Sequence, residues 1–186
     1  MIMRRYQIIL ADPPWPIRWV TVPTKSGFKG LEYPTMAIAE MCNLPVKNIA
    51  DECSKCFVWT TNHFLLEGLF LIRSWGFQFD KLWVWCKKTG AGGHPRTATE
   101  YVIEGTRGLL KSIGANNVKA TNNWFIASKG KHSVKPEVVR DMIDRFYPNC
   151  SKIELFARQK ALGWDCLGFD VDGKDIKQSI EELSEI

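Results

Sequence analysis

Apolar runs and amphipathic stretches alternate along most of the chain. The runs are short, rich in β-branched and aromatic residues and bounded by turn residues, which is typical of buried strands. The stretches between them carry apolar residues at helical spacing. We expect strands at about 6–10, 56–61, 79–87, 101–108, 123–128 and 152–157. We expect helices at about 36–42, 62–75, 136–146 and 176–183.

Single residues mark several of these boundaries. Thr35 is the expected N-cap of the helix at 36–42. Pro136 is expected in the first turn of the helix that reaches about residue 146, because its fixed φ suits that position. Gly76 is expected to end the helix that begins at residue 62. The segment at 88–99 is polar and rich in Gly, so it is expected to be a loop.

The order of the elements predicts one α/β domain over residues 1–186. Strands that alternate with helices form mostly parallel sheets with helices on both faces. A chain of this length buries a sizeable core by itself. It contains no internal repeat and no linker that would divide it, and its last segment, 174–186, is expected to be an acidic helical tail.

Composition and charge narrow the class further. Hydrophobic residues make up 45% of the chain and charged residues 24%, which indicates a globular protein. No apolar run approaches the roughly 20 residues of a transmembrane helix. Asp12 and the prolines end the first apolar run too early for a signal peptide, so we expect a cytoplasmic protein with no membrane partner. Residues 1–169 carry 23 basic and 14 acidic residues, a net charge of +9, which fits a polyanionic partner and equally an ordinary soluble surface.

The six cysteines raise the question of metal or disulfide bonds. Cys53 and Cys56 have the spacing of half a zinc site, but the chain has no second such pair and no paired histidines. Cys56 also opens an apolar run, where cysteine behaves as a small buried hydrophobe. We therefore expect reduced structural cysteines and no metal site.

The segment Ala-Asp-Pro-Pro-Trp directly follows the first expected strand. Asp12 then lies at the carboxyl end of a strand, where open α/β sheets place ligands. Pro13 and Pro14 stiffen the turn and lack N–H donors, so the turn offers carbonyl acceptors beside the carboxylate. Trp15 adds a flat face. The four residues are candidate catalytic residues for a planar group that bears an amine, although Pro-Pro-aromatic alone predicts a turn.

Other common signatures are missing from the sequence. No GxGxxG follows an expected strand and no GxxxxGK(S/T) occurs, which argues against an ordinary dinucleotide or P-loop domain. No nucleophile elbow and no recognisable pair of glycosidase carboxylates occurs either. The chemistry therefore depends on the Asp-Pro-Pro-Trp segment and on the blocks that accompany it.

Eight blocks occur in a fixed order along the chain. They are ADPPW (11–15), YPTM (33–36), WTT (59–61), WVWCK (83–87), RTATEYVIEGTRG (96–108), HSVKPE (132–137), IELFAR (153–158) and GWDCLGFDVDG (163–173). In this order they closely resemble the adenine-N6 methyltransferase family, which includes the catalytic subunit of the messenger-RNA N6-adenosine methyltransferase and its bacterial and phage relatives. The resemblance covers residues 8–173, nearly the whole chain.

The resemblance implies a fold and a reaction. The implied fold is a Rossmann-like three-layer sandwich in which a catalytic block (9–36) precedes a cofactor block (132–173). The implied reaction transfers a methyl group from S-adenosylmethionine to the exocyclic N6 amine of adenine in nucleic acid, and the compact chain favours DNA. The amine is a poor nucleophile, so the Asp12 carboxylate and the Pro13 carbonyl are expected to accept its hydrogens and orient its lone pair. Trp15 is expected to stack on the base, which must first leave its own stack.

The late blocks supply the implied cofactor site. Lys135 matches the family's lysine near the cofactor carboxylate and the target amine, and Asp12 also borders the cofactor. Phe156 and Arg158 match the residues that bind the nucleoside part of the cofactor, and Asp170 is placed to accept from ribose hydroxyls. Two purely structural interpretations stay open. Lys135 could be a solvated lysine before a helix, and Phe156 could be an ordinary core residue.

The substrate side rests on four further residues. By resemblance, Tyr33 and Glu100 border the target base, although Glu100 could also be a surface residue at the start of a strand. The segments 17–33 and 88–99 are the candidate target-reading loops. Lys25 and Lys29 of the first loop are candidate phosphate contacts, and a merely solubilising role for them stays open.

Two features depart from the family pattern. Phe169 replaces an Asn that relatives often carry, so a hydrogen-bonding group is missing beside the cofactor. Relatives also have an acidic residue well upstream of the Asp-Pro-Pro-Trp segment that holds the cofactor's adenine, and too few residues precede Asp12 here to supply it. Another group must hold the adenine.

Two other functions remain open at this point. One is a catalytically silent subunit that binds nucleic acid or an active paralogue, although this chain retains the whole Asp-Pro-Pro-Trp block. The other is an enzyme that acts on cytosine or a protein amide, but such enzymes usually carry Ser or Asn at position 12 and Tyr at position 15. The resemblance leaves a homodimer or a heterodimer with a paralogue open.

Overall fold

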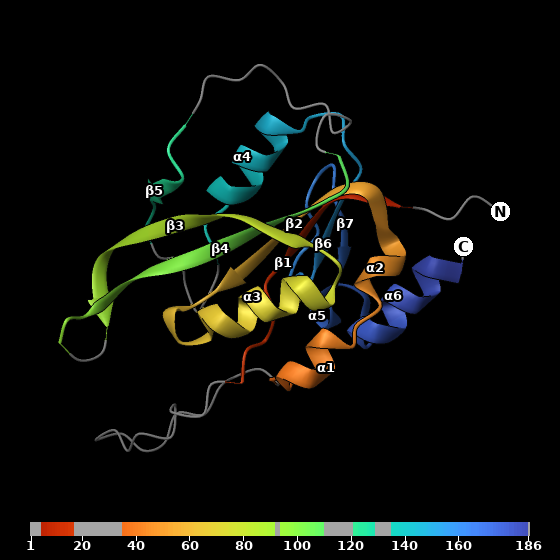
Figure 1. Cartoon of the computed structure of the whole chain (residues 1–186), viewed down its shortest axis with the longest axis horizontal. Helices are drawn as coiled ribbons and strands as arrows, with labels where there is room; N and C mark the ends of the chain where they lie inside the picture. The colour runs from red at the N-terminus through yellow and green to blue at the C-terminus, as the bar shows by residue number, and fades with distance from the viewer. Residues whose placement is uncertain (1–4, 17–34, 92–93, 110–120, 129–134, 186) are drawn as a thin grey trace.

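The computed structural model describes residues 5–16, 35–91, 94–109, 121–128 and 135–185 (Figure 1). The strands are β1 (Tyr6–Ala11), β2 (Ala50–Thr60), β3 (Gln78–Ala91), β4 (Thr97–Arg107), β5 (Trp124–Ile126), β6 (Lys152–Leu155) and β7 (Asp165–Leu167). The helices are α1 (Ile38–Cys42), α2 (Val46–Ile49), the 3-10 helix η1 (Asn62–Phe64), α3 (Leu65–Ser74), α4 (Val138–Phe146), α5 (Phe169–Asp172) and α6 (Ile176–Glu185).

Within the described residues, the strands form one seven-stranded sheet in the order β5-β3-β4-β2-β1-β6-β7. β1 pairs in parallel with β2 and β6, and β3–β5 and β6–β7 are parallel as well. β4 is antiparallel to both β2 and β3. The sheet is therefore mixed but mostly parallel, which confirms the predicted α/β fold with a Rossmann-like sheet.

The first strand lies in the middle of this sheet and is buried on both faces. Tyr6, Ile9 and Ala11 face one core cluster, and Ile8 and Leu10 face the other. The register of β1 against β2 shifts between Tyr6 and Ile8, which marks a bulge that resets the alternation. The near-continuous apolar run YQIILA is what a central strand covered on both faces requires.

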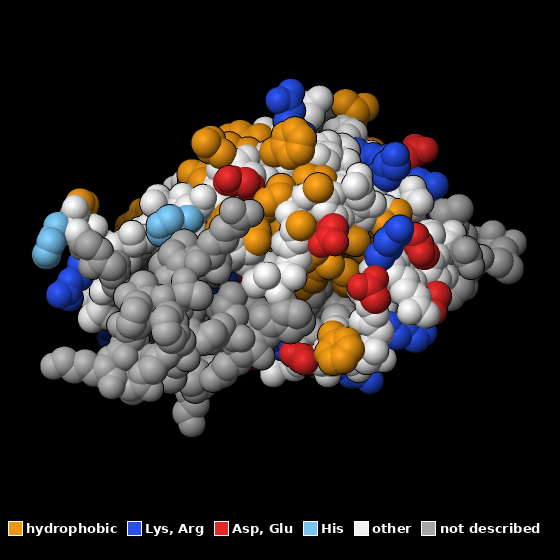
Figure 2. All heavy atoms as spheres, turned by 90° about the horizontal axis from the view of Figure 1, so that it is seen from below, with side chains coloured by type: hydrophobic (Ala, Val, Ile, Leu, Met, Phe, Trp, Pro, Cys, Tyr) orange, Lys and Arg blue, Asp and Glu red, His pale blue; other side chains and the backbone are white. Residues whose placement is uncertain are grey.

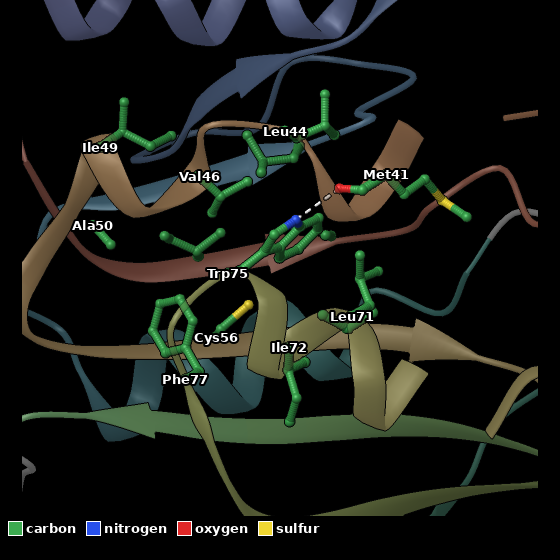
Figure 3. Close-up of a cluster of buried hydrophobic side chains, with 14 of the residues drawn as sticks. Met41, Leu44, Val46, Ile49, Ala50, Cys56, Leu71, Ile72, Trp75 and Phe77 are labelled. Atoms are coloured by element: carbon green, nitrogen blue, oxygen red, sulfur yellow. Dashed lines mark hydrogen bonds between the residues drawn. The ribbon is translucent and has the colours of Figure 1, made fainter. Parts of the chain in front are cut away.

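Helices cover both faces of the sheet, as predicted. On one face, α1, α2, α3 and α6 pack their apolar side chains against the sheet, and in Figure 1 these helices lie below it and to its right. Figure 3 shows the centre of this cluster, where the Trp75 indole N–H donates to the Met41 carbonyl at 2.8 Å. On the other face, α4 packs Val139 and Ile143 against Phe57, Trp59, Trp83 and Trp85.

Three local predictions are wrong. Thr35 is not the N-cap of α1: Ala37 takes that place, and the Glu40 carboxylate accepts from the Ala37 N–H at 2.9 Å. Pro136 lies before α4, whose N-cap is Glu137. The segment 88–99 is not a loop throughout, because β3 continues to Ala91 and β4 begins at Thr97. Cross-strand pairing extends both strands through residues whose polar composition favoured a loop.

Several short elements carried too little pattern to be expected. α2 and α5 have four residues each and β7 has three. All six cysteines are free thiols. Across the described ranges, no helix combines the length and the apolar character needed to cross a membrane.

Candidate active site

The Asp-Pro-Pro-Trp turn begins where β1 ends. The Asp12 N–H donates to the Leu155 carbonyl of β6 at 3.4 Å, which places Asp12 at the carboxyl ends of two adjacent parallel strands. The Pro13 carbonyl accepts from the Trp15 N–H at 2.9 Å, and the Pro14 carbonyl accepts from the Met36 N–H at 2.9 Å. The turn was expected to present carbonyls without competing donors. Both carbonyls have a backbone donor, so a ligand amine would use the second lone pair of either oxygen.

Trp15 is fixed on two sides. Its side chain is buried, its indole N–H donates to the Trp59 carbonyl at 2.9 Å, and its ring stacks on Phe64 with centroids 5.4 Å apart and planes 13° apart. Phe64 therefore covers one face of the indole and holds its plane. Nothing in the local sequence links Phe64 to the turn.

Four charged side chains form an alternating row at the end of the sheet, Asp12–Lys135–Glu100–Lys87, which we call the charged row. The Lys135 Nζ lies 2.9 Å from Asp12 Oδ1 and 3.5 Å from Glu100 Oε2. The other oxygen of Glu100, Oε1, pairs with the Lys87 Nζ. The four side chains are 17–23% exposed, so they are partly shielded from water. Attraction between such shielded charges is stronger than on an open surface.

Two tryptophans lie beneath the charged row. The Lys135 Nζ is 5.6 Å from the centroid of the Trp59 ring, and the Lys87 Nζ is 4.9 Å from that of Trp85. The two indoles meet edge to face, with centroids 6.1 Å apart. Ring faces attract cations, so the two indoles support the ammonium groups of the row.

The segment after β6 has an unusual backbone. Phe156 has φ +60°, a left-handed conformation that costs a non-glycine residue about 1–3 kcal/mol. This conformation turns the chain sharply at the strand end, and both Phe156 and Arg158 then line the cavity described below. Gly168 lies against the same segment: a Cβ there would lie 2.2 Å from the Ala157 carbonyl oxygen. Glycine is required for this close approach.

A partly shielded ion pair lies near Asp12 on the α4 side of the sheet. Glu154 Oε2 lies 3.4 Å from a guanidinium nitrogen of Arg140, close enough for an ion pair but without hydrogen-bond geometry. Burial raises the pKa of Glu154, and nearby Asp12 raises it further, while Arg140 lowers it. Arg140 therefore offsets only part of the cost of burying this carboxylate.

Several of these residues line a cavity of about 830 Å³. Its walls come from the turn after β1, the end of β6, the start of α5 and the first turn of α6. Figure 2 views the molecule from the side towards which β1 runs, and hydrophobic side chains gather near the middle of this face among acidic and basic ones. The lining residues include Asp12, Pro13, Pro14, Trp15, Thr35, Met36, Glu40, Asn43, Leu44, Thr61, Trp85, Glu100, Lys135, Phe156, Ala157, Arg158, Gly168, Phe169, Asp170, Lys174, Asp175, Ile176 and Lys177.

The cavity brings together candidate residues from five separate sequence blocks. They are Asp12, Pro13, Pro14, Trp15, Glu100, Lys135, Phe156, Arg158 and Asp170. Tyr33, Lys25 and Lys29 lie outside the described residues, as does the whole first candidate target-reading loop, 17–33. Neighbours with no assigned role also emerge, among them Thr61, Trp85 and Glu40. Trp85 could have been singled out from the sequence. Trp83, Trp85 and Lys87 occupy every second position of the expected strand and therefore share one face.

The chain belongs to the MT-A70 family, whose model matches residues 6–170. It is 34% identical to the type II methyltransferase M.MunI of a Mycoplasma species, over 94% of this chain and 81% of that protein. It is 27% identical to the human N6-adenosine-methyltransferase catalytic subunit METTL3, over 92% of this chain and 29% of that protein. A putative N6-adenosine-methyltransferase of Medicago truncatula is 28% identical, and 27% of its length is covered. The chain thus spans most of the bacterial relative but about a quarter of each of these plant and human relatives, and the predicted family is confirmed.

Proposed function

We propose that this MT-A70 protein transfers a methyl group from S-adenosylmethionine to the N6 amine of adenine in nucleic acid, with DNA as the preferred polymer. The observation that carries the proposal is the pairing of Asp12 with Lys135 at 2.9 Å, at the wall of a cavity that also contains the residues after β6. An acceptor and a cation lie side by side where two ligands would meet.

Asp12 is the group that acts on the amine. Its carboxylate accepts a hydrogen bond from the N–H of the target and so aims the nitrogen lone pair away from the ring plane. It can also take up the proton that the nitrogen loses. Such an acceptor serves the transition state more than the bound substrate, because positive charge grows on the nitrogen as the reaction proceeds.

The cofactor's functional groups match the chemistry of the lining. Lys135 supplies a cation for the carboxylate of the methionyl part, and Asp170 supplies acceptors for ribose hydroxyls. Phe156 and Arg158 flank the nucleoside part, and Phe169 adds an exposed apolar face to the wall. When bound, S-adenosylmethionine supplies an electrophilic methyl group on a sulfonium. Lys135 and Asp12 orient it within reach of the amine.

The base side of the proposal depends on Trp15 and Glu100. Phe64 covers one face of Trp15, so the base contacts the part of the indole that borders the cavity. Tyr33, and the lysines at 25 and 29 for phosphates, complete this side as proposals. Chemistry on a base in this cavity requires the adenine to leave its stack, and aromatic stacking of about 1–3 kcal/mol per base helps to offset that cost.

The test compares two acidic residues that are each paired with a lysine. Wild-type protein, Asp12→Asn and Asp80→Asn are incubated with S-adenosylmethionine and with adenine-containing DNA or RNA oligonucleotides. Asp80 is a matched control, because it is 27% exposed and lies 3.4 Å from the Lys55 Nζ but does not line the cavity. N6-methyladenine is then measured by mass spectrometry after digestion. We expect Asp12→Asn to lose about 100-fold or more in turnover and Asp80→Asn to keep it.

Three outcomes redirect the proposal. Methylation of RNA and not of DNA corrects the polymer and leaves the chemistry intact. Binding of both ligands without methyl transfer by the wild type supports a catalytically silent subunit instead. Near-wild-type turnover by Asp12→Asn overturns the assignment of Asp12.

A further inference from the structure

Lys87 occupies the end of the charged row farthest from Asp12. Asp12, Glu100 and Lys135 line the cavity, whereas Lys87 is not among the described lining residues. Lys87 pairs with Oε1 of Glu100, the oxygen that Lys135 does not contact. Its position is set by the sheet, since Trp85 of β3 is the cross-strand partner of Glu100 in β4. Because Lys87 does not line the cavity and pairs with Glu100, which does, we expect any effect it has on binding to pass through Glu100.

Glu100 and Asp12 compete for the same ammonium. The Lys135 Nζ lies closer to Asp12, at 2.9 Å, than to Glu100, at 3.5 Å. Glu100 already has a cation of its own, because Lys87 pairs with its other oxygen. Without that cation, the Glu100 carboxylate would attract Lys135 more strongly and draw it away from Asp12.

We propose that Lys87 is a positioning residue that keeps Lys135 on the Asp12 side of the row, where it can bind the carboxylate of the methionyl part of the cofactor. This inference rests on the proposed function. In the wild type, two carboxylates and two ammonium groups balance within the row. Without Lys87, a bound cofactor brings a third carboxylate to a row with one cation, so cofactor affinity falls although no contact to the ligand is lost.

Four variants distinguish the positioning of Lys135 by Lys87 from a general structural effect of the substitution. Lys87→Met removes the charge and keeps the length of the stem that lies over Trp85. Lys87→Arg restores a cation. Lys87→Met/Glu100→Gln removes the carboxylate that Lys87 neutralises, so the row is balanced again. Lys81→Met is the matched control, because Lys81 lies on the same strand, is 51% exposed and pairs with Asp80 at 3.5 Å.

Two ligands test where the effect arises. S-adenosylhomocysteine carries the carboxylate that Lys135 is proposed to bind, and 5′-methylthioadenosine lacks the whole amino-acid part. Calorimetry with purified protein at low salt should show S-adenosylhomocysteine bound about tenfold more weakly by Lys87→Met. Lys87→Arg, the double variant and Lys81→Met should each stay within about threefold of the wild type. For 5′-methylthioadenosine, Lys87→Met and the wild type should have equal affinity.

The outcomes are distinct. Equal affinity of Lys87→Met and wild type for S-adenosylhomocysteine overturns the inference. So does an equal loss for both ligands, or a double variant as weak as the single one, since each indicates a general structural effect. A wild type that binds neither S-adenosylhomocysteine nor S-adenosylmethionine contradicts the proposed function itself.

Discussion

Two lysine–carboxylate clusters lie on the same face of the sheet, under α4, and differ in how completely the protein surrounds them. In the first, the buried pair, Lys55 of β2 meets Glu104 of β4. Their side chains are 7% and 3% exposed, against 17–23% in the charged row. The Trp83 indole N–H donates to the second oxygen of Glu104 at 2.7 Å, and Asp80 lies 3.4 Å from the Lys55 Nζ.

The difference lies in the partners that each cluster has. Protein groups deep in the sheet contact both oxygens of Glu104, so the buried pair offers no free acceptor to a ligand. The charged row uses the same residue types but borders the cavity at Asp12, Lys135 and Glu100. Burial turns a lysine–carboxylate pair into part of the fold, and partial exposure at a strand end makes it available for binding.

The largest expected effect breaks the buried pair. Lys55→Met leaves the Glu104 carboxylate buried without its cation, which should lower the free energy of unfolding by about 3–5 kcal/mol. Urea denaturation followed by tryptophan fluorescence measures the change. Lys81→Met is the control and should cost about 0–1 kcal/mol, because Lys81 is 51% exposed and its ion pair with Asp80 is open to water. A loss equally small for both variants would contradict the distinction between the clusters.

A smaller effect on stability is expected from the charged row, together with a clear effect on binding. Lys135→Met should change the free energy of unfolding by at most about 1 kcal/mol, because the row is partly hydrated. It should weaken S-adenosylmethionine binding about tenfold in calorimetry, because one charge-assisted contact is lost. Unchanged affinity, or destabilisation as large as that of Lys55→Met, would contradict a ligand-binding role for the charged row.

The smallest effect concerns Glu154, whose side chain is more exposed than the buried pair and slightly less exposed than the charged row. Burial raises its pKa in the folded state, with Asp12 adding to the rise and Arg140 opposing it. A raised folded pKa means that stability is fully present below the unfolded value of about 4.3 and falls as the pH rises through the folded value. Glu154→Gln should remove this fall. Unfolding free energies measured from pH 4 to 7 test it, and parallel curves for the two proteins would show that Glu154 does not carry the dependence.

The sequence predicted the main strands because each is a dense apolar run. The Asp-Pro-Pro-Trp segment was selected from its place after a strand, whereas the other described candidate residues came from the family resemblance, and all of them line one cavity. Asp12 directly follows an apolar strand, and parallel strands bring their carboxyl ends to one edge of the sheet. The same rule explains why Phe156, which the resemblance selected, follows a strand that pairs with β1, although 144 positions separate it from Asp12. These features depend on local pattern and on general topology.

What could not be predicted depends on contacts between distant side chains. The pairing of Lys87 with Glu100 follows from the register of β3 against β4, which the polar composition of residues 88–99 concealed. The left-handed backbone at Phe156 has no signal in a residue type that normally avoids it. The stack of Phe64 on Trp15 joins two turns that no periodicity connects.

The pairing of β1 with β6 has a consequence for synthesis on the ribosome. β1, which Asp12 directly follows, leaves the ribosome well before its neighbour β6, because β6 lies far later in the sequence. The hairpin of β3 and β4 can form early, whereas the wall that joins Asp12 to Phe156 must wait for β6. A nascent chain therefore has its antiparallel half before it has the complete cavity wall, and the apolar strand β1 stays without one of its neighbours until β6 has emerged.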